Sequence, residues 1–146
     1  MYLAVVIDLY SRQAVGWTIN KQMKVPLAKD ALVMTYFRPE PSKGLLHHSD
    51  GGGQDTGHES QDQLKQSGMT WSMSRKGNGW DNSVVESFFH PLKTECTHEK
   101  RYLTREEARA DIIDYIEMFY NSNRLHSTLG YVSPNDFENE IRKNAA

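Results

Sequence analysis

Asp50 and Glu86 are the two residues of this 146-residue chain whose surroundings best suit metal-ion chemistry. Asp50 ends a short apolar segment, and the three glycines that follow it leave its carboxylate uncovered. Glu86 lies in a segment with helical periodicity, after 35 intervening residues, 51–85. Open α/β sheets place ligands at the carboxyl ends of their strands, so a strand end and a helix could bring both acids to one divalent cation. Such a pair of carboxylates suits metal-assisted phosphoryl transfer.

The predicted helix around Glu86 carries other polar residues on the same face. Asn82 stands four residues before Glu86, and His90 and Lys93 stand four and seven residues after it. The opposite side of the helix is apolar, with Val85, Phe88, Phe89 and Leu92. An acid beside a histidine and a lysine could hold a metal next to a phosphate. The structural alternatives are a surface pair between Glu86 and His90, and an Asx-turn at Asp50.

Other catalytic arrangements have less support in the residues. The histidines and the cysteine do not fall into zinc-binding spacings, and no Gly-x-Ser-x-Gly elbow indicates a serine hydrolase. Cys96 is the only cysteine, which excludes an internal disulfide and suits a reducing compartment. No apolar run approaches the roughly 20 residues of a membrane span, so we expect no membrane partner.

Composition places limits on how the chain could contact nucleic acid. A net charge of −2 provides no overall attraction, so any DNA contact has to come from local basic clusters. Such clusters also occur on ordinary solvated faces. The candidates are Arg75 with Lys76, Lys100 with Arg101, and Arg105 with Arg109.

Periodicity and turn residues predict a mixed α/β domain. The predicted strands cover residues 3–9, 14–19, 45–49 and 70–74, and the first two form a hairpin. Because residues 3–9 are apolar on both faces, we expect that strand to be buried on both sides. The predicted helices cover residues 26–37, 58–66, 82–97 and 104–120, and a last one begins at Ser133-Pro134. Thr104 and Glu107 form a capping box, and Gly68 ends the second helix.

Several segments together resemble the catalytic core of bacterial insertion-sequence transposases. They are Tyr2-Leu3-Ala4-Val5-Val6-Ile7-Asp8 with Ser11-Arg12, His47-His48-Ser49-Asp50-Gly51, and Ser72-Met73-Ser74-Arg75-Lys76-Gly77-Asn78 leading into Asp81-Asn82 and Glu86-Ser87-Phe88-Phe89. The tail with Tyr120-Asn121, Arg124, His126, Leu129-Gly130-Tyr131 and Ser133-Pro134 matches the family's C-terminal signature. The resemblance covers nearly the whole chain. This family is similar to retroviral integrases and uses an Asp, Asp, Glu triad.

The resemblance implies a ribonuclease H-like mixed sheet with flanking helices, followed by C-terminal helices. Residues 1–99 would form part of the catalytic core, and residues 100–146 its C-terminal helical part. Asp50 and Glu86 would be catalytic ligands of Mg²⁺ or Mn²⁺, which two-metal sites use to cut and join DNA. The implied DNA-binding residues are Lys93, Asn82, His90, Arg75 and Lys76.

The same resemblance predicts that the chain is incomplete. The family's first catalytic Asp lies on a strand before the one that opens this chain, and that strand is central in the sheet. Asp8 matches a position on the second strand, not the triad, although it could substitute for the missing ligand. Pro91 departs from the family inside a helix, where proline costs about 3 kcal/mol or forces a kink. Gly51 and Asp55 replace residues that are commonly basic and aromatic in relatives.

We therefore expect a transposase core that acts on element ends and target DNA, but is inactive alone. The alternative is a non-catalytic fragment that binds DNA or pairs with full-length transposase and inhibits it. A stand-alone nuclease of the same fold is a third reading. A cytoplasmic, nucleoid-associated protein that forms a homo-oligomer or pairs with the full-length protein fits the first two. The recognised end and target sequences do not follow from these residues.

Overall fold

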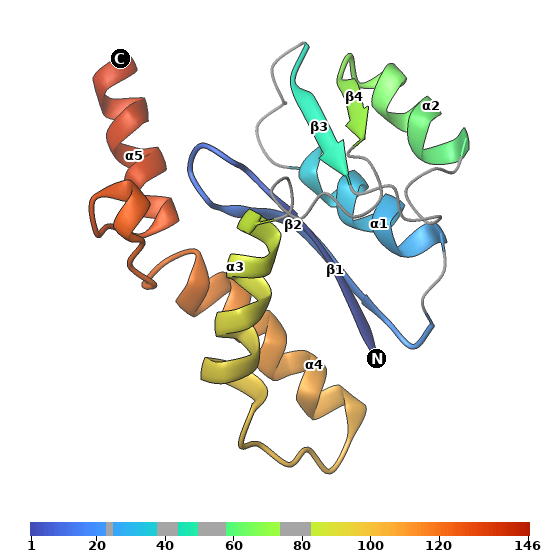
Figure 1. Ribbon diagram of the computed structural model, residues 1–146, viewed down its shortest axis with the longest axis vertical. Coiled ribbons are helices and arrows are strands. Elements are labelled where there is room, and N and C mark those ends of the chain that lie inside the picture. The colour runs from blue at the N-terminus through green and yellow to red at the C-terminus, as the bar shows by residue number, and fades with distance from the viewer. Residues whose placement is uncertain (23–24, 38–43, 50–57, 74–82) are drawn as a thin grey trace. The chain divides into compact units, whose positions relative to one another are not determined.

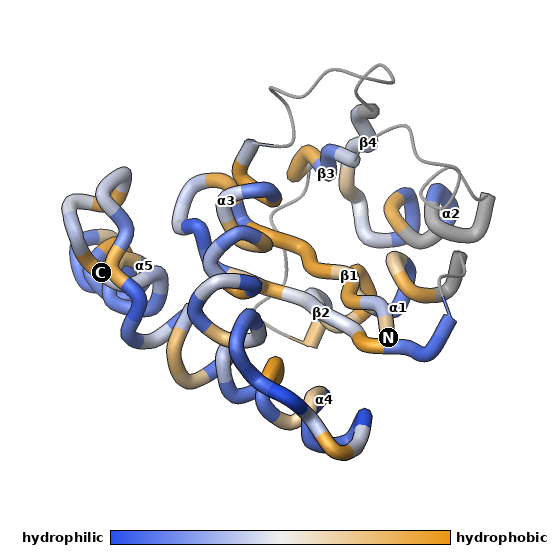
Figure 2. Tube along the Cα trace, turned by 60° about the horizontal axis from the view of Figure 1, so that its bottom comes forward, coloured by the Kyte–Doolittle hydropathy of each residue, from blue (hydrophilic) through white to orange (hydrophobic). Residues whose placement is uncertain are grey.

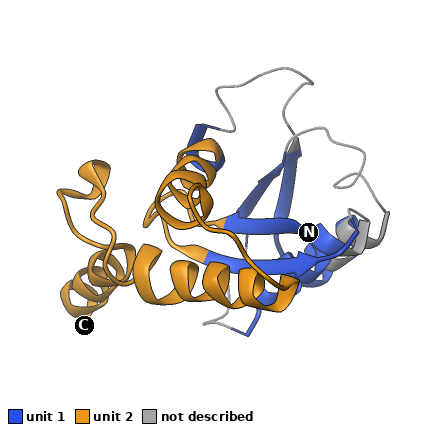
Figure 3. Cartoon of the chain, turned by 90° about the horizontal axis from the view of Figure 1, so that it is seen from below, with its two compact units in different colours: residues 1–6, 15–85 blue, residues 7–14, 86–146 orange. Residues whose placement is uncertain are grey.

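The computed structural model in Figure 1 describes residues 1–22, 25–37, 44–49, 58–73 and 83–146. The chain divides into two compact units (Figure 3): residues 1–6 with 15–85, and residues 7–14 with 86–146. The sequence predicts a different division, into residues 1–99 and 100–146 of one catalytic core. That division stays a prediction.

The first unit contains two helices and four strands, of which the first two reach into the second unit. They are β1 (Tyr2–Ile7), β2 (Ala14–Asn20), α1 (Val25–Thr35), β3 (Leu46–Ser49), α2 (His58–Gln66) and β4 (Thr70–Met73). Each lies within two residues of its predicted bounds. The predicted helix over residues 26–37 ends slightly early, because Tyr36 and Phe37 form turn hydrogen bonds to Val33 and Met34.

The described strands form two sheets of two strands each, β1 with β2 and β3 with β4. β3 and β4 run parallel, with Leu46 opposite Thr70 and Ser49 opposite Met73. Parallel neighbours need a crossover, and α2 supplies it. The predicted α/β class is confirmed. The single ribonuclease H-like sheet that lacks its central strand stays a prediction.

β1 differs from its predicted environment. Figure 2 shows it as a largely apolar segment, which favoured burial on both faces. That expectation is wrong: Tyr2 is exposed and the rest of the strand is half-buried. Among the described strands only β2 is hydrogen-bonded to β1, so β1 is an edge strand. Water can reach the side chains on both faces of an edge strand from its unpaired side.

The end of α2 confirms the predicted role of Gly68. Its φ of 68° is in the left-handed region, where glycine has no steric cost. The Gly68 N–H donates to the Lys65 carbonyl, and the Met69 N–H donates to the Leu64 carbonyl. This pair of bonds is a Schellman motif, which satisfies the last carbonyls of the helix and directs the chain into β4.

Gly16 allows β2 to approach α1 closely. A Cβ at this position would lie 2.1 Å from the Ala31 carbonyl oxygen and 2.7 Å from Cγ2 of Thr35. The Trp17 N–H, next in the strand, lies 3.4 Å from Sδ of Met34 on the same helix. Glycine is therefore required here by the helix backbone.

The regular elements of the second unit are helices, apart from the ends of β1 and β2 and an isolated bridge between His126 and Val132. Its elements are α3 (Ser83–Pro91, whose first turn belongs to the first unit), a π-helical segment η1 (Leu92–Thr97), α4 (Arg105–Asp114), a second π-helical segment η2 (Tyr115–Tyr120), a 3₁₀ turn η3 (Ser127–Leu129) and α5 (Pro134–Ala145). The predicted helix over residues 82–97 thus continues through Pro91, but it changes from α- to π-helical bonding directly after the proline. Pro91 itself keeps helical angles, φ −59° and ψ −40°.

Both predicted N-caps of the second unit are confirmed. The Glu107 N–H donates to Oγ1 of Thr104 at 3.1 Å, and the Thr104 N–H donates to the Glu107 carboxylate at 3.4 Å. Oγ of Ser133 accepts from the Asp136 N–H at 3.2 Å, and Pro134 occupies the first turn of α5. These bonds satisfy N–H groups that a helix start leaves without partners.

The core of the second unit contains packed aromatic rings and one buried amide among its aliphatic residues. Phe88 and Tyr120 are fully buried and meet edge to face, with ring centroids 4.8 Å apart. Asn121, also buried, accepts a bond from the Ala14 N–H at 2.9 Å and donates one to the Ala14 carbonyl at 3.0 Å. The Asn121 carbonyl accepts from the Asn135 N–H at 2.9 Å. Through its side chain and its backbone carbonyl, Asn121 thereby joins the end of the hairpin turn to the start of α5.

We predict that Gly16→Ala lowers the free energy of unfolding by about 1–3 kcal/mol, because the new methyl group forces β2 away from α1. Urea unfolding of the variant measures the effect. The double variant with Thr35→Ala removes the one side chain that the new methyl group would meet, but it leaves the Ala31 carbonyl in place. We therefore expect it to stay destabilised. Full recovery in the double variant would contradict the backbone explanation.

We predict that Asn121→Ala costs about 2–3 kcal/mol, because it leaves the buried N–H and carbonyl of Ala14 without partners. Thermal unfolding compares it with Asn139→Ala, a change at an exposed position of α5 that should stay within about 0.5 kcal/mol of the parent. Similar losses in the two variants would show that the amide bonds carry little of the stability.

Candidate active site

Three of the seven predicted site residues lie in the described part of the chain. Glu86 and His90 are exposed residues of α3, and Lys93 is an exposed residue of η1. The other four lie outside the described residues: Asp50, Asn82, Arg75 and Lys76. The predicted convergence of Asp50 and Glu86 therefore stays a prediction.

The helix that carries Glu86 separates its polar and apolar residues as the periodicity predicted. Phe88 and Leu92 are buried, whereas Glu86, His90 and Lys93 are exposed. Phe88 fixes the orientation of the helix through its contact with Tyr120. The burial of Phe88 and Leu92 therefore keeps the Glu86 side of α3 in solvent.

The Glu86 carboxylate makes no hydrogen bond or ion pair with the described residues. An exposed carboxylate without a protein partner offers hard oxygen atoms, the ligand type that Mg²⁺ and Mn²⁺ prefer. Glu86 therefore fits the role of a metal ligand as far as a single donor can. Across the described segments, no group of three or more His, Cys, Asp or Glu residues is placed to hold a metal ion.

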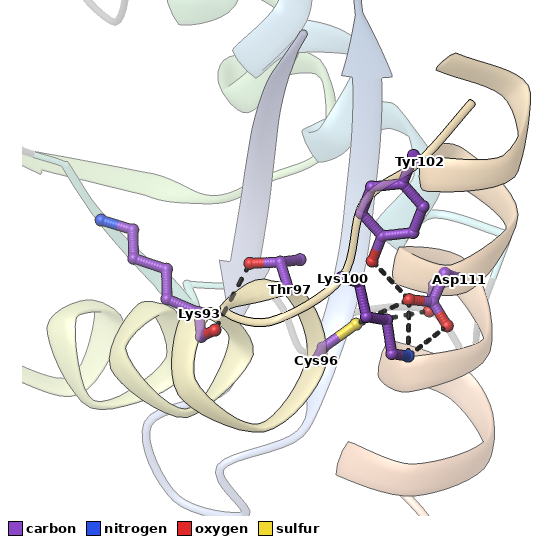
Figure 4. Close-up of polar contacts among 6 residues, drawn as sticks. All are labelled: Lys93, Cys96, Thr97, Lys100, Tyr102 and Asp111. Atoms are coloured by element: carbon purple, nitrogen blue, oxygen red, sulfur yellow. Dashed lines mark hydrogen bonds and ion pairs between the residues drawn. The ribbon is translucent and has the colours of Figure 1, made fainter. Parts of the chain in front are cut away.

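The ammonium group of Lys93 likewise has no hydrogen bond or ion pair with a described residue. Figure 4 shows its side chain extending away from the polar cluster that follows it along the chain. Its carbonyl accepts a bond from Oγ1 of Thr97 at 3.4 Å, but its ammonium group has no partner among the described residues. An ammonium group in this setting can attract a phosphate as a point charge.

Asp8 does not resemble a spare metal ligand. Its Oδ1 atom accepts bonds from the N–H groups of Tyr10 and Ser11, both at 2.8 Å, and lies 3.2 Å from Oγ of Ser11. These contacts are those of an Asx-turn, which stabilises the connection between β1 and β2. The turn explains why an acid stands at this position.

Lys100 belongs to a predicted basic cluster, but it is bound internally. Its Nζ atom lies 2.8 and 3.0 Å from the two Asp111 oxygens, and the Tyr102 hydroxyl donates to the same carboxylate (Figure 4). The hydrogen bond from Lys100, followed by that from Tyr102, holds the pKa of Asp111 below its usual value. The cluster fastens the connection before α4 onto that helix, and it pairs the Lys100 charge with a carboxylate although the lysine side chain stays 51% exposed.

Glu95 and Arg124 form a second internal ion pair that the sequence did not predict. Nη2 of Arg124 lies 3.2 Å from Oε1 of Glu95, and the Tyr115 hydroxyl donates to Oε2 at 2.8 Å. Burial and the Glu95 hydrogen bond raise the pKa of Tyr115. Glu95 thus joins η1 to η2 and to the segment after it. Residues 29 positions apart leave no periodic signal for such a pair.

Comparison with known proteins identifies related sequences over most of the chain. Two family models, both described as integrase core domain, match residues 1–79 and residues 86–141. The chain is 46% identical over 140 residues to the transposase InsF for insertion sequence IS3A of Escherichia coli (strain K12). It is 44% identical over 138 residues to the transposase for insertion sequence element IS904 of Lactococcus lactis subsp. lactis (strain IL1403).

These alignments cover unequal shares of the two partners. They include 96% of this chain but 49% of the InsF transposase, and 94% of this chain but 54% of the IS904 transposase. The chain therefore spans about half the length of the curated relatives that it matches. Among the described helices, none has the length and apolar character needed to cross a membrane.

We predict that the thiol of Cys96 reacts slowly with iodoacetamide in the folded chain. Burial, and then the Asp111 carboxylate, raise its pKa to about 11, so little reactive thiolate forms at lower pH. Asp111→Asn should lower this pKa and speed alkylation, which a pH profile of the rate measures. Asp114→Asn removes an equal charge from an exposed position of α4, and its profile should match the parent. An unchanged profile in Asp111→Asn would contradict the assignment.

Proposed function

Because the chain belongs to the integrase core domain family, whose matched relatives are insertion-sequence transposases, we propose that it provides part of a metal-dependent DNA transposition site. The observation that carries this proposal is the exposed carboxylate of Glu86, which has no partner among the described residues and lies within a segment that matches the family model. Its reaction is the cutting of a DNA phosphodiester at an element end and the joining of that end to target DNA.

Asp50 and Glu86 would hold the cation, Mg²⁺ or Mn²⁺. When bound, such an ion stabilises the charge on the attacking and leaving oxygens of an in-line displacement at phosphorus. Glu86 supports this role by its exposure and by the absence of a competing partner among the described residues. Asp50 is proposed from its place after β3, the strand that ends at Ser49.

The remaining predicted residues would bind the DNA. Lys93 would attract a phosphate near the scissile bond, since its ammonium group is exposed and not paired with a described residue. His90, exposed one turn after Glu86, can donate or accept a hydrogen bond at the same face. Asn82, Arg75 and Lys76 are proposed from the sequence motif alone. Base-specific recognition is not assigned to any of them.

The complete reaction is proposed for the whole protein. The curated relatives are about twice as long as the matched region. Two carboxylates also fix two cations poorly, because each ion keeps more water and is held less rigidly. We therefore propose that these 146 residues alone neither cut nor join DNA. Pairing with a second copy or with a longer transposase is part of this proposal.

We predict that the purified chain binds Mn²⁺ through Glu86, and that Glu86→Gln weakens this binding at least tenfold, as removal of one carboxylate ligand should. Electron paramagnetic resonance of free Mn²⁺ measures the binding without requiring catalysis. Glu99→Gln removes the same charge from an exposed residue of the same unit and should leave Mn²⁺ binding unchanged. Equal binding by the parent chain and Glu86→Gln would refute the metal role.

The same purified chain also tests whether its catalytic site is complete. Element-end DNA and Mg²⁺ are added, and nicked and joined products are separated on a gel. We expect none from the chain alone. Joining that disappears in Asp50→Ala would show that the site is complete, whereas DNA binding without Mn²⁺ binding would favour the non-catalytic alternative.

A further inference from the structure

Arg12 has an unusual backbone conformation. It lies in the turn between β1 and β2 with a φ of 61°, in the left-handed region that most residues with a Cβ avoid. The Asx-turn of Asp8 holds the preceding residues, and Ser11 is fully buried. Glycine would adopt this conformation without strain, so the arginine side chain is retained there at a conformational cost.

The turn is attached firmly to the C-terminal part of the second unit. Ala14, two residues after Arg12, is bonded twice to Asn121. Nε2 of Gln13 donates to Oδ1 of Asn135 at 2.6 Å. These bonds hold Arg12 beside the segment that follows η2, where its charge acts on Tyr120 and His126. The position of the Arg12 backbone is therefore fixed by hydrogen bonds from both following residues.

The charges around this turn do not balance. Arg124 also acts on Tyr120 and His126, but Glu95 neutralises it through their ion pair. Arg12 is a half-buried residue, and its guanidinium has no hydrogen bond or ion pair with any described residue. A positive charge that is partly removed from water and lacks an acid is unfavourable unless an anion approaches it.

His126 adds no positive charge to this cluster. Its ring packs edge to face on Tyr120, with centroids 5.1 Å apart, and its Nε2 atom is buried without a hydrogen-bond partner among the described residues. Burial, then the charges of Arg124 and Arg12, lower its pKa to about 4, so the ring is neutral near neutral pH. The uncompensated charge is therefore that of Arg12.

We propose that Arg12 is a DNA-binding residue whose guanidinium donates to a backbone phosphate. A planar guanidinium can donate two parallel hydrogen bonds to one phosphate, and this geometry requires a fixed approach, which the attached turn provides. Backbone phosphate contacts position a protein on DNA without reading its sequence. The proposal depends on the proposed function only in taking DNA as the partner, and it does not involve the metal site.

The test measures DNA binding by the full chain in EDTA, where no metal-dependent step can occur. Fluorescence anisotropy of labelled duplex DNA gives the dissociation constant over a range of salt concentrations. We expect Arg12→Gln to weaken binding on the order of tenfold at low salt. The slope of log K against log salt should become shallower by about 0.9, as expected for one lost phosphate contact.

Three further samples complete the comparison. Arg12→Lys keeps the charge but not the paired donors, so it should recover part of the affinity. Lys143→Gln removes one positive charge from an exposed position of α5 outside the predicted basic clusters and should have a smaller effect. Inorganic phosphate added to the parent chain distinguishes a site for free phosphate, which it would saturate at low concentration, from a DNA-backbone contact.

Each remaining result overturns the proposal. These are equal affinities and salt slopes for Arg12→Gln and Lys143→Gln, weaker binding with an unchanged slope, or a loss of folding that accounts for the weaker binding. Failure of the parent chain to bind DNA overturns it as well. Loss of Mn²⁺ binding with salt-dependent DNA binding intact would instead count against the metal site alone.

Discussion

The second unit depends on the pairing between the Asn121 side chain and the backbone of Ala14. A carboxamide presents a donor and an acceptor side by side, so it can bond to both polar groups of a backbone residue as a neighbouring strand would. This pairing connects residues 107 positions apart, and the carbonyl of the same asparagine accepts a bond at the start of α5. The hairpin turn with Arg12 is thus held by the side chain of one buried asparagine, and the start of α5 by the backbone carbonyl of the same residue.

The acidic residues of this unit divide into structural and available groups. Asp8 stabilises a turn, Asp111 binds Lys100 and Tyr102, and Glu95 binds Arg124 and Tyr115. Each of these carboxylates already accepts hydrogen bonds from the protein. Glu86 differs because it stands on the exposed face of α3 without a partner among the described residues. A carboxylate that the fold does not use can serve a ligand without loss of stability.

Local features were predictable from the sequence because neighbouring residues determine them. The capping box at Thr104, the cap at Ser133 and the Schellman motif at Gly68 each involve residues within a few positions of one another. The helical spacing of apolar residues along α3 also predicted that the face opposite Glu86 is buried. Pairing between distant segments left no such signal: the apolar run of β1 suggested full burial, and neither the Glu95–Arg124 pair nor the role of Asn121 was expected. Of the site, the exposed face of α3 was predicted correctly, whereas Asp50 lies outside the described residues.

The change of helix type after Pro91 also sets the direction in which later side chains point. A π-helical turn closes over five residues instead of four, so each residue advances by a smaller angle around the axis than in an α-helix. The angular offset between Glu86 and Lys93 is consequently different from that of two α-helical turns, although seven positions still separate them. Glu95 lies in the same π-helical segment, and its carboxylate bonds to Tyr115 and Arg124. The change of helix type between the acid and the base thus alters the direction of one relative to the other, which counting residues along an ideal helix would overlook.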